Sequence, residues 1–211
     1  MRVNRNLCLL ALTMFIVGTD GFVVAGVLES VARQTGVSVE AAGQLITVFA
    51  LAYAISGPAI ASVLGRMDRK RFLLLSLAVF TGGNLVVALS SDYALLIAGR
   101  MVSAIGAAGV TPAVVTIAGM TAQPERRGRA ISLVFNGLTI ATILGVPFGT
   151  YLGRALDYRL LFLFIAVGGA MMLAVLAAAL TRLPPPPDAS FRERLSVVRV
   201  KGAPSTLLVT A

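Results

Sequence analysis

Residues 131–153 read ISLVFNGLTIATILGVPFGTYLG, a run of 23 residues without a charged side chain. A helix rises about 1.5 Å per residue, so this run is long enough to cross the hydrocarbon core of a bilayer, which is about 30 Å thick. Five more runs of similar length and composition occupy residues 7–28, 41–64, 72–91, 93–120 and 160–181. Only two charged residues, Asp20 and Arg100, fall within the six runs. The pattern predicts an all-α membrane protein in which residues 1–181 form six transmembrane helices.

The amino-acid composition favours the same class. Hydrophobic residues make up 57% of the chain, charged residues 13%, and the mean hydropathy is +0.90, which is typical of membrane proteins with several spans. The chain has no His and a single Cys, Cys8, so we expect no metal site. The sequence also offers no nucleophile paired with a base and no phosphate-binding glycine loop. We therefore expect neither a cofactor nor an enzyme.

The positive charges lie in alternate loops between the predicted helices. If the N-terminus is cytoplasmic, fourteen of the 18 Lys and Arg residues lie on the cytoplasmic side. These are Arg2, Arg5, Arg66, Arg69, Lys70, Arg71, Arg126, Arg127, Arg129, Arg182, Arg192, Arg194, Arg199 and Lys201. This bias satisfies the positive-inside rule and predicts a cytoplasmic N-terminus in a cell membrane, which we interpret as a bacterial plasma membrane. The net charge of +9 then reflects topology, and we expect no nucleic-acid partner.

The segment after the sixth run differs in composition from the rest. Residues 182–203 contain four consecutive prolines and several charges, which predicts a cytoplasmic linker. Within it Phe191, Leu195 and Val198 recur at helical spacing, so a short helix on the inner membrane surface fits as well. Residues 204–211, PSTLLVTA, read as the truncated start of a seventh helix. Eight residues cannot span a bilayer, and either a fragment of a longer transporter or a natural truncation explains them.

Small residues in the fifth run recur every four positions. They are Gly137, Ala141, Gly145, Gly149 and Gly153. This spacing places them on one face of a helix, where small residues let a neighbouring backbone approach closely in the membrane. Pro147 removes one backbone hydrogen bond and predicts a bend near the middle of the same helix. We expect this face to pack against another helix, either as plain packing or as part of a conformational change.

Residues 145–153, GVPFGTYLG, resemble the fifth-helix antiporter motif of the major facilitator superfamily, in its arabinose-efflux and drug:proton antiporter branch. Three other segments are similar to that branch in order and spacing. They are GTDGFVVAGVLESVARQTGVS at 18–38, ASVLGRMDRKR at 61–71 and GRMVSAIGAAG at 99–109. The resemblance covers essentially the whole chain but only the first half of a twelve-helix family. It implies half of a transporter that works with a C-terminal six-helix half or, alternatively, with a second copy of the chain.

The loop between the second and third runs occupies the place of the superfamily's basic loop motif. Its charged residues are Arg66, Asp68, Arg69, Lys70 and Arg71. The family usually has Asp where Gly65 stands and Gly where Asp68 stands. Asp68 is therefore a candidate to replace the missing acid in the gating role that the resemblance implies. Anchoring of the basic residues at the inner membrane face is the alternative explanation.

The two charges within the membrane are predicted at similar depth. Counted from the outer ends of their helices, Asp20 lies about 12 Å deep and Arg100 about 10 Å deep. A charge at such depth is costly and normally faces a partner or a water-filled cavity. In the fold that the resemblance implies, the first and fourth helices line the central cavity, so both side chains should face it near one another. We hypothesise that Asp20 takes up and releases a proton while Arg100 biases that equilibrium, with a static structural ion pair as the alternative. Many members of the branch have their first-helix acid at the position of Gly21.

Four further residues are weaker candidates for the cavity wall, because each also fits ordinary helix packing. They are Phe22, Gln44, Tyr53 and Asn136. The function that we predict is export of small amphiphilic, drug-like compounds by a secondary transporter in exchange for protons. Its partners would be lipid, protons and the small-molecule substrate. The alternatives are a sugar or metabolite exporter of the same branch, and an inactive or homodimerising six-helix membrane protein.

Overall fold

The computed structural model describes residues 5–63, 67–155 and 157–181. Its helices in chain order are α1 (Arg5–Val23), the 3-10 turn η1 (Val24–Gly26), α2 (Leu28–Thr35), α3 (Val39–Val63), α4 (Arg69–Leu89), α5 (Tyr93–Thr121), the 3-10 turn η2 (Pro124–Arg126), α6 (Arg127–Ala155) and α7 (Tyr158–Ala179). Among the described residues, six helices are long and apolar enough to cross a membrane: α1 with η1, α3, α4, α5, α6 with η2, and α7. The predicted all-α class with six transmembrane helices is therefore confirmed.

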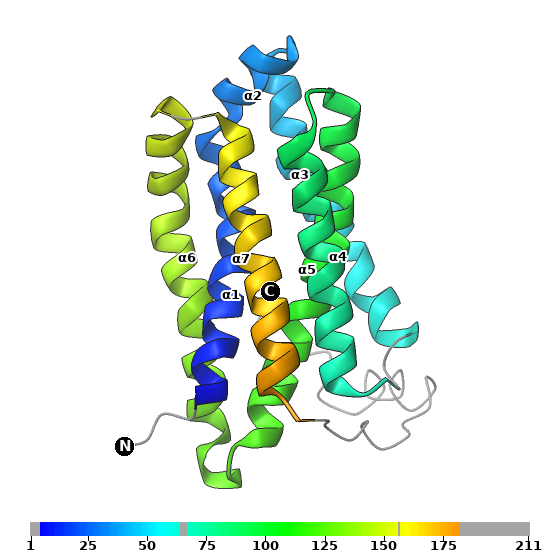
Figure 1. The fold of residues 1–211 in the computed structure, drawn as a ribbon, viewed down its shortest axis with the longest axis vertical. Coiled ribbons are helices and arrows are strands. Elements are labelled where there is room, and N and C mark those ends of the chain that lie inside the picture. Colours follow the sequence, from blue (N-terminus) through cyan, green and yellow to red (C-terminus); the bar gives the residue numbers. More distant parts are fainter. Residues whose placement is uncertain (1–4, 64–66, 156, 182–211) are drawn as a thin grey trace, which may run out of the picture.

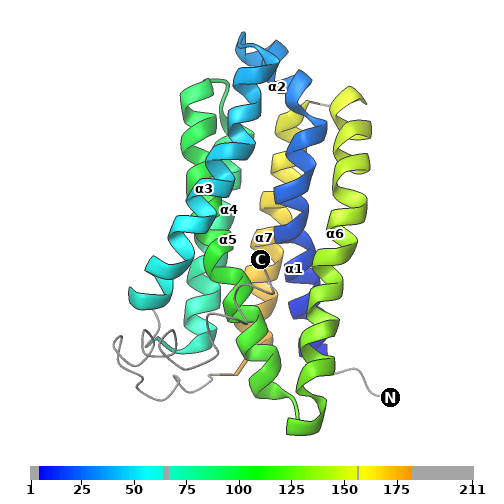
Figure 2. The ribbon, with the colours of Figure 1, turned by 180° about the vertical axis from the view of Figure 1, so that it is seen from behind.

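The six spans stand side by side as an upright bundle (Figures 1 and 2). Both views place α6 beside α1 on one side of the bundle and α4 beside α5 on the other. Helix α7 packs against both α1 and α4, and α3 packs against α5. Helix α2, which hydropathy did not predict, lies at the end of the bundle where α1 finishes, and Gly36 ends it in the left-handed conformation at φ 72°.

Three aspartates begin helices by accepting a hydrogen bond from a backbone N–H in the first turn. Asp68 begins α4, Asp92 begins α5 and Asp157 begins α7. An aspartate at this position satisfies one of the amide donors that a helix start leaves without a partner. These caps explain why acidic residues occur directly before three of the apolar runs.

Helices α4 and α5 touch backbone to backbone. A Cβ at Gly83 would collide with the backbone nitrogen of Ser103, and a Cβ at Gly106 would collide with the backbone nitrogen of Phe80. Glycines at such contacts allow the short interhelical distance that stabilises helix pairs in lipid. The pair therefore forms a rigid part of the bundle, and α5 carries one of the two membrane charges.

Basic residues gather at one end of the bundle, and a buried hydrogen bond joins two helices at the other. Arg5, Arg71 and Arg127 lie at the end where α1, α4 and α6 begin, together with other basic residues of the short loops. At the opposite end, the buried Tyr158 hydroxyl at the start of α7 donates to the backbone oxygen of Ser90 at 2.9 Å and ties α7 to α4. The predicted linker at 182–203, the predicted seventh-helix start at 204–211 and Arg66 all lie outside the described residues.

Candidate functional site

The two membrane charges meet in the interior of the bundle. An Nη1 donor of Arg100, on α5, lies 2.7 Å from Oδ1 of Asp20, on α1. Both side chains are fully buried, with 0% exposure. The two residues are 80 positions apart in the chain. Two opposite charges at matching depth were therefore a correct guide to which side chains come together.

Aromatic rings cover the guanidinium group of Arg100. Its Cζ atom lies 4.1 Å from the ring centroid of Phe49, on α3, and 5.6 Å from that of Phe162, on α7. Cations over aromatic faces are stabilised by the ring quadrupole, the more so where water is excluded. The ion pair is thus enclosed by four spans, since α1, α3, α5 and α7 each contribute a side chain.

The ion pair is incompletely hydrogen-bonded. Oδ2 of Asp20, together with Nε and Nη2 of Arg100, is buried without a hydrogen-bond partner in the described part of the chain. Asn84, buried on α4, lies beside the carboxylate, but its amide nitrogen donates to the backbone oxygen of Phe80 at 3.1 Å. Buried polar atoms without partners are costly and are enriched where water, an ion or a conformational change completes the network. The choice between a proton-carrying pair and a static structural ion pair stays a prediction.

A cavity of about 340 Å³ lies next to the ion pair. Residues of α1, α3, α5 and α6 line it: Met14, Val17, Gly18, Gly21, Phe22, Ile46, Phe49, Ala50, Tyr53, Ala107, Thr111 and Leu138. Its wall is mostly apolar. The Tyr53 hydroxyl donates to Oγ1 of Thr111 at 3.2 Å, and these two hydroxyls bring polar groups to the wall. An apolar cavity with few polar groups suits a small amphiphilic ligand.

The ion pair lies behind the wall of this cavity and not in it. Neither Asp20 nor Arg100 is among the lining residues, and both are fully buried. This differs from the expectation that both side chains face the central cavity. The reason is helical geometry, because successive residues of a helix point about 100° apart. Gly21 lines the cavity, while Asp20, one position earlier, points to α5.

The weaker candidates divide into two groups. Phe22 and Tyr53 line the cavity, and the side chain of Phe22 is 37% exposed. Gln44 and Asn136 are exposed and are not among the residues that line it. The two aromatic candidates therefore line this cavity and the two amides do not, and a role of any of the four in substrate binding stays a prediction.

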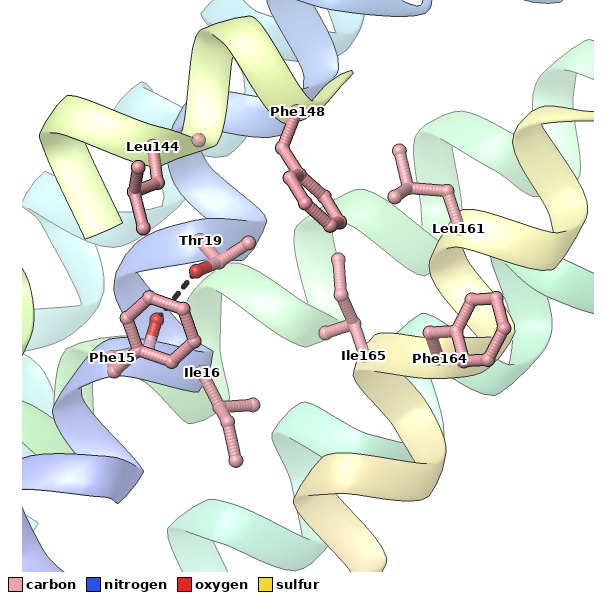
Figure 3. Close-up of a pocket in the computed structure, with 9 residues that line it drawn as sticks. Phe15, Ile16, Thr19, Leu144, Phe148, Leu161, Phe164 and Ile165 are labelled. Carbon is pink, nitrogen blue, oxygen red and sulfur yellow. Dashed lines mark hydrogen bonds between the residues drawn. The ribbon is translucent and has the colours of Figure 1, made fainter. Parts of the chain in front are cut away.

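A larger pocket of about 590 Å³ lies between α1, α6 and α7, and neither Asp20 nor Arg100 lines it (Figure 3). Phe15, Phe148 and Ile165 are among the apolar side chains that point into it. Its one hydroxyl, that of Thr19, donates to the backbone oxygen of Phe15 at 2.7 Å and is thereby satisfied within α1. This pocket offers no charged group for proton chemistry, so we place the candidate site at the ion pair and its neighbouring cavity.

The small-residue face of α6 packs against α1. A Cβ at Gly137 would collide with the backbone oxygen of Ala11, and one at Gly149 would collide with the backbone oxygen of Val23. A Cβ at Gly145 would lie 2.8 Å from that of Phe22. Ala141 is fully buried on the same face, whereas the surroundings of Gly153 lie outside what the structure describes. The face therefore holds α6 directly on the helix that carries Asp20.

Helix α6 runs as one helix through Pro147. Pro147 lies two residues from both Gly145 and Gly149, which face α1. Whether the proline serves a movement of α6 stays a prediction.

The basic loop is tied to its neighbours at the start of α4. Oδ1 of Asp68 accepts from the backbone nitrogen of Arg71 at 2.9 Å. Nζ of Lys70 donates to the backbone oxygens of Ala177 at 2.6 Å and Leu180 at 2.5 Å, so it caps the C-terminal end of α7. A cation at a helix C-terminus is favoured by the carbonyl groups gathered there. Lys70 thus joins α4 to α7, while a gating role for Asp68 and Arg69 stays a prediction.

Sequence reasoning missed Phe49 and Asn84. Phe49 is an apolar residue among apolar residues, so its polarity does not distinguish it from its neighbours. Only its spacing of four residues from Tyr53 indicated that the two rings share a helix face. Asn84 was detectable, because a polar amide in the middle of an apolar run is itself a signal of a buried contact. Within the described ranges, no group of three or more His, Cys, Asp or Glu residues could hold a metal ion.

Comparison with known proteins adds the family. The profile of the Major Facilitator Superfamily matches residues 10–209. The MFS-type transporter YbcL of Bacillus subtilis is 36% identical over 168 residues, which cover 80% of this chain and 43% of that protein. The inner membrane transport protein YdhP of Escherichia coli is 30% identical over 210 residues, 100% of this chain and 54% of that protein.

A relative from Streptomyces lividans, named chloramphenicol resistance protein, is 33% identical over 161 residues, 76% of this chain and 41% of that protein. Among solved structures, the peptide transporter POT in complex with sulfate is similar in fold, with a TM-score of 0.76 at 17% identity over 98% of this chain and 45% of that one. The chain thus spans about half the length of the relatives that it matches.

Proposed function

This chain belongs to the major facilitator superfamily and is a multi-pass membrane protein, and we propose that it is the N-terminal half of an exporter that exchanges small amphiphilic, drug-like compounds for protons. In this proposal the Asp20 carboxyl group takes up and releases the proton. Arg100 holds the carboxylate when it is charged, and the neighbouring cavity accepts the substrate.

The observation that carries the proposal is the buried ion pair itself. A carboxylate and a guanidinium group 2.7 Å apart are costly to keep in a membrane protein when both are fully buried and three of their polar atoms have no partner among the described residues. A proton on Asp20 would abolish its charge and weaken its attraction to Arg100. Protonation and opening of the contact between α1 and α5 would thereby be linked.

The drug-like substrate is supported by the apolar wall of the cavity and by the relative named chloramphenicol resistance protein. The cavity has an aromatic side, formed by Phe22, Phe49 and Tyr53, and two hydroxyl groups. Such a surface fits a compound with one apolar ring and a few hydrogen-bonding groups. A second six-helix half would close the cavity on the other side in the transport cycle of this fold.

The test is transport by the full-length protein reconstituted in liposomes. An outward or inward pH gradient should drive movement of chloramphenicol or another compound from a panel of drugs and sugars, with counterflow of protons reported by a trapped pH dye. Asp20→Asn should abolish both movements, because the amide cannot carry the proton. Glu29→Gln, which changes an exposed acid on α2, should leave both intact. Coupled export by the Asp20→Asn protein at the wild-type rate would refute the proposal, and transport of sugars alone would select the metabolite exporter.

A further inference from the structure

We propose that Phe49 is the seal between the ion pair and the cavity, and that a ligand in the cavity displaces its ring and so admits water and protons to Asp20. This inference rests on the proposed function, because it explains how substrate binding in the cavity could be coupled to proton access at Asp20.

The position of Phe49 is shared between the two parts of the site. Its ring covers Arg100, with 4.1 Å between the ring centroid and Cζ. The same side chain lines the cavity and is only half-buried, in contrast to the two fully buried charges. A ligand that fills the cavity must therefore touch the ring that covers the guanidinium group.

The surroundings of Phe49 leave its ring room at one side and hold it at another. A Cβ at Gly21 would lie 4.0 Å from Cε1 of Phe49, an ordinary contact distance, and both residues line the cavity, which gives the ring room on that side. Tyr53 stacks on Phe49 with 6.3 Å between centroids and 19° between planes, and its hydroxyl is held by Thr111. The ring thus rests in one position against Tyr53 and has space toward Gly21.

The polar atoms of the ion pair that lack partners explain why water would enter if the ring moved. Oδ2 of Asp20 and two nitrogens of Arg100 are buried without hydrogen-bond partners within the described ranges. Water bonds strongly to such atoms and enters a polar site that is large enough to hold it. The apolar ring of Phe49 lines the cavity and covers the guanidinium group, so in this proposal its displacement opens a route for water and therefore for protons.

The test measures proton flux without substrate. Full-length protein in liposomes with a trapped pH dye is given a pH gradient, and the dye reports passive proton entry. Phe49→Ala and Phe49→Leu should raise this flux by about tenfold or more, the change expected if the barrier falls by about 1.4 kcal/mol. Phe135→Ala, which removes a partly exposed ring on α6, should leave the flux unchanged. The Leu variant keeps apolar bulk and decides the matter if the Ala variant fails to fold.

Asp20→Asn in the Phe49→Leu background identifies the route. If protons pass through the ion pair, this second substitution should return the flux to the wild-type value. The proposed seal is refuted if Phe49→Leu has the same passive proton flux as wild type. It is also refuted if the raised flux of Phe49→Leu persists when Asp20→Asn is added. Either result leaves the proposed function standing as long as Asp20→Asn alone abolishes coupled export. Coupled export by Asp20→Asn would instead refute the proposed function.

Discussion

Replacing Asp20 with Leu should destabilise the folded bundle, and replacing Arg100 with Met at the same time should restore most of the loss. The single substitution leaves a guanidinium group that cannot be deprotonated in the middle of the membrane. The double substitution leaves neither charge, and two apolar side chains can pack against Phe49 and Phe162. The two outcomes together measure how strongly the charges depend on one another.

The magnitude follows from the geometry. Both side chains are fully buried and in contact at 2.7 Å, and removal of one partner from such a pair typically costs about 3–5 kcal/mol. The ring of Phe49 covers the guanidinium group before and after the substitution, so this contact does not change the expected difference. A loss of about 3–5 kcal/mol is therefore expected for Asp20→Leu. The double variant should be within about 1 kcal/mol of wild type, because buried ion pairs replaced by apolar residues are often neutral.

The assay is reversible unfolding in mixed detergent micelles, followed by far-ultraviolet circular dichroism because the chain has no Trp. Arg100→Met alone completes the double-mutant cycle. Thr139→Val, an exposed hydroxyl that bonds to its own helix, is the control and should change stability by less than about 0.5 kcal/mol. If Asp20→Leu lowers the free energy of unfolding by less than about 1 kcal/mol, the ion pair contributes no more than an ordinary hydrogen bond in a membrane. That result would refute a strong dependence of the two charges on one another. Additive losses in the double variant would also contradict it.

Two further substitutions test the packing around the site, with the same unfolding assay. Gly83→Ala should lower the free energy of unfolding by about 1–3 kcal/mol, because the added Cβ would meet the backbone of α5. Gly82→Ala, one residue earlier, has open space around its Cβ and should be neutral or slightly stabilising. Equal effects of the two substitutions would contradict the close contact of α4 with α5. Tyr158→Phe should cost about 1–2 kcal/mol because it leaves the Ser90 carbonyl without its donor. Tyr151→Phe, at a side chain that is 74% exposed, should change little, and a similar loss in both would show that the hydroxyl bond to Ser90 is unimportant.

The spans of this protein were predictable because hydropathy reports directly on what lies within lipid. The six runs correspond to α1, α3, α4, α5, α6 and α7, although α6 begins at Arg127, four residues before the apolar run at 131–153. Helix α2 was missed, because eight residues with a mixed composition carry too little signal to be separated from a loop.

Contacts within the site were predictable only where chemistry contrasts with its surroundings. Asp20 and Arg100 stand out as charges in apolar runs, so their meeting could be inferred from depth alone. The regular spacing of Gly137 and its neighbours likewise indicated a packing face, and that face lies on α1. Which way Asp20 points relative to the cavity depended on one helical position and could not be read from a pattern that locates helices only to within a few residues. The contact of Phe49 with Arg100 depends on the relative position of α3 and α5, which hydropathy does not report.

The arrangement of the helices also indicates which part of the site is free to move. Helix α1 is locked to α6, and α4 to α5, through glycines that bring backbones into contact. Helix α3 instead meets α5 through side chains, such as the bond from Tyr53 to Thr111. Side chains can change rotamer without separating helices, while backbone contacts cannot be exchanged without moving a whole helix. Because Phe49 lies on α3, its ring can swing away from Arg100 while both helix pairs stay intact. In the proposed mechanism a ligand would need to supply only the energy of a ring movement to open the ion pair to water, and the larger rearrangement of helices would follow protonation of Asp20.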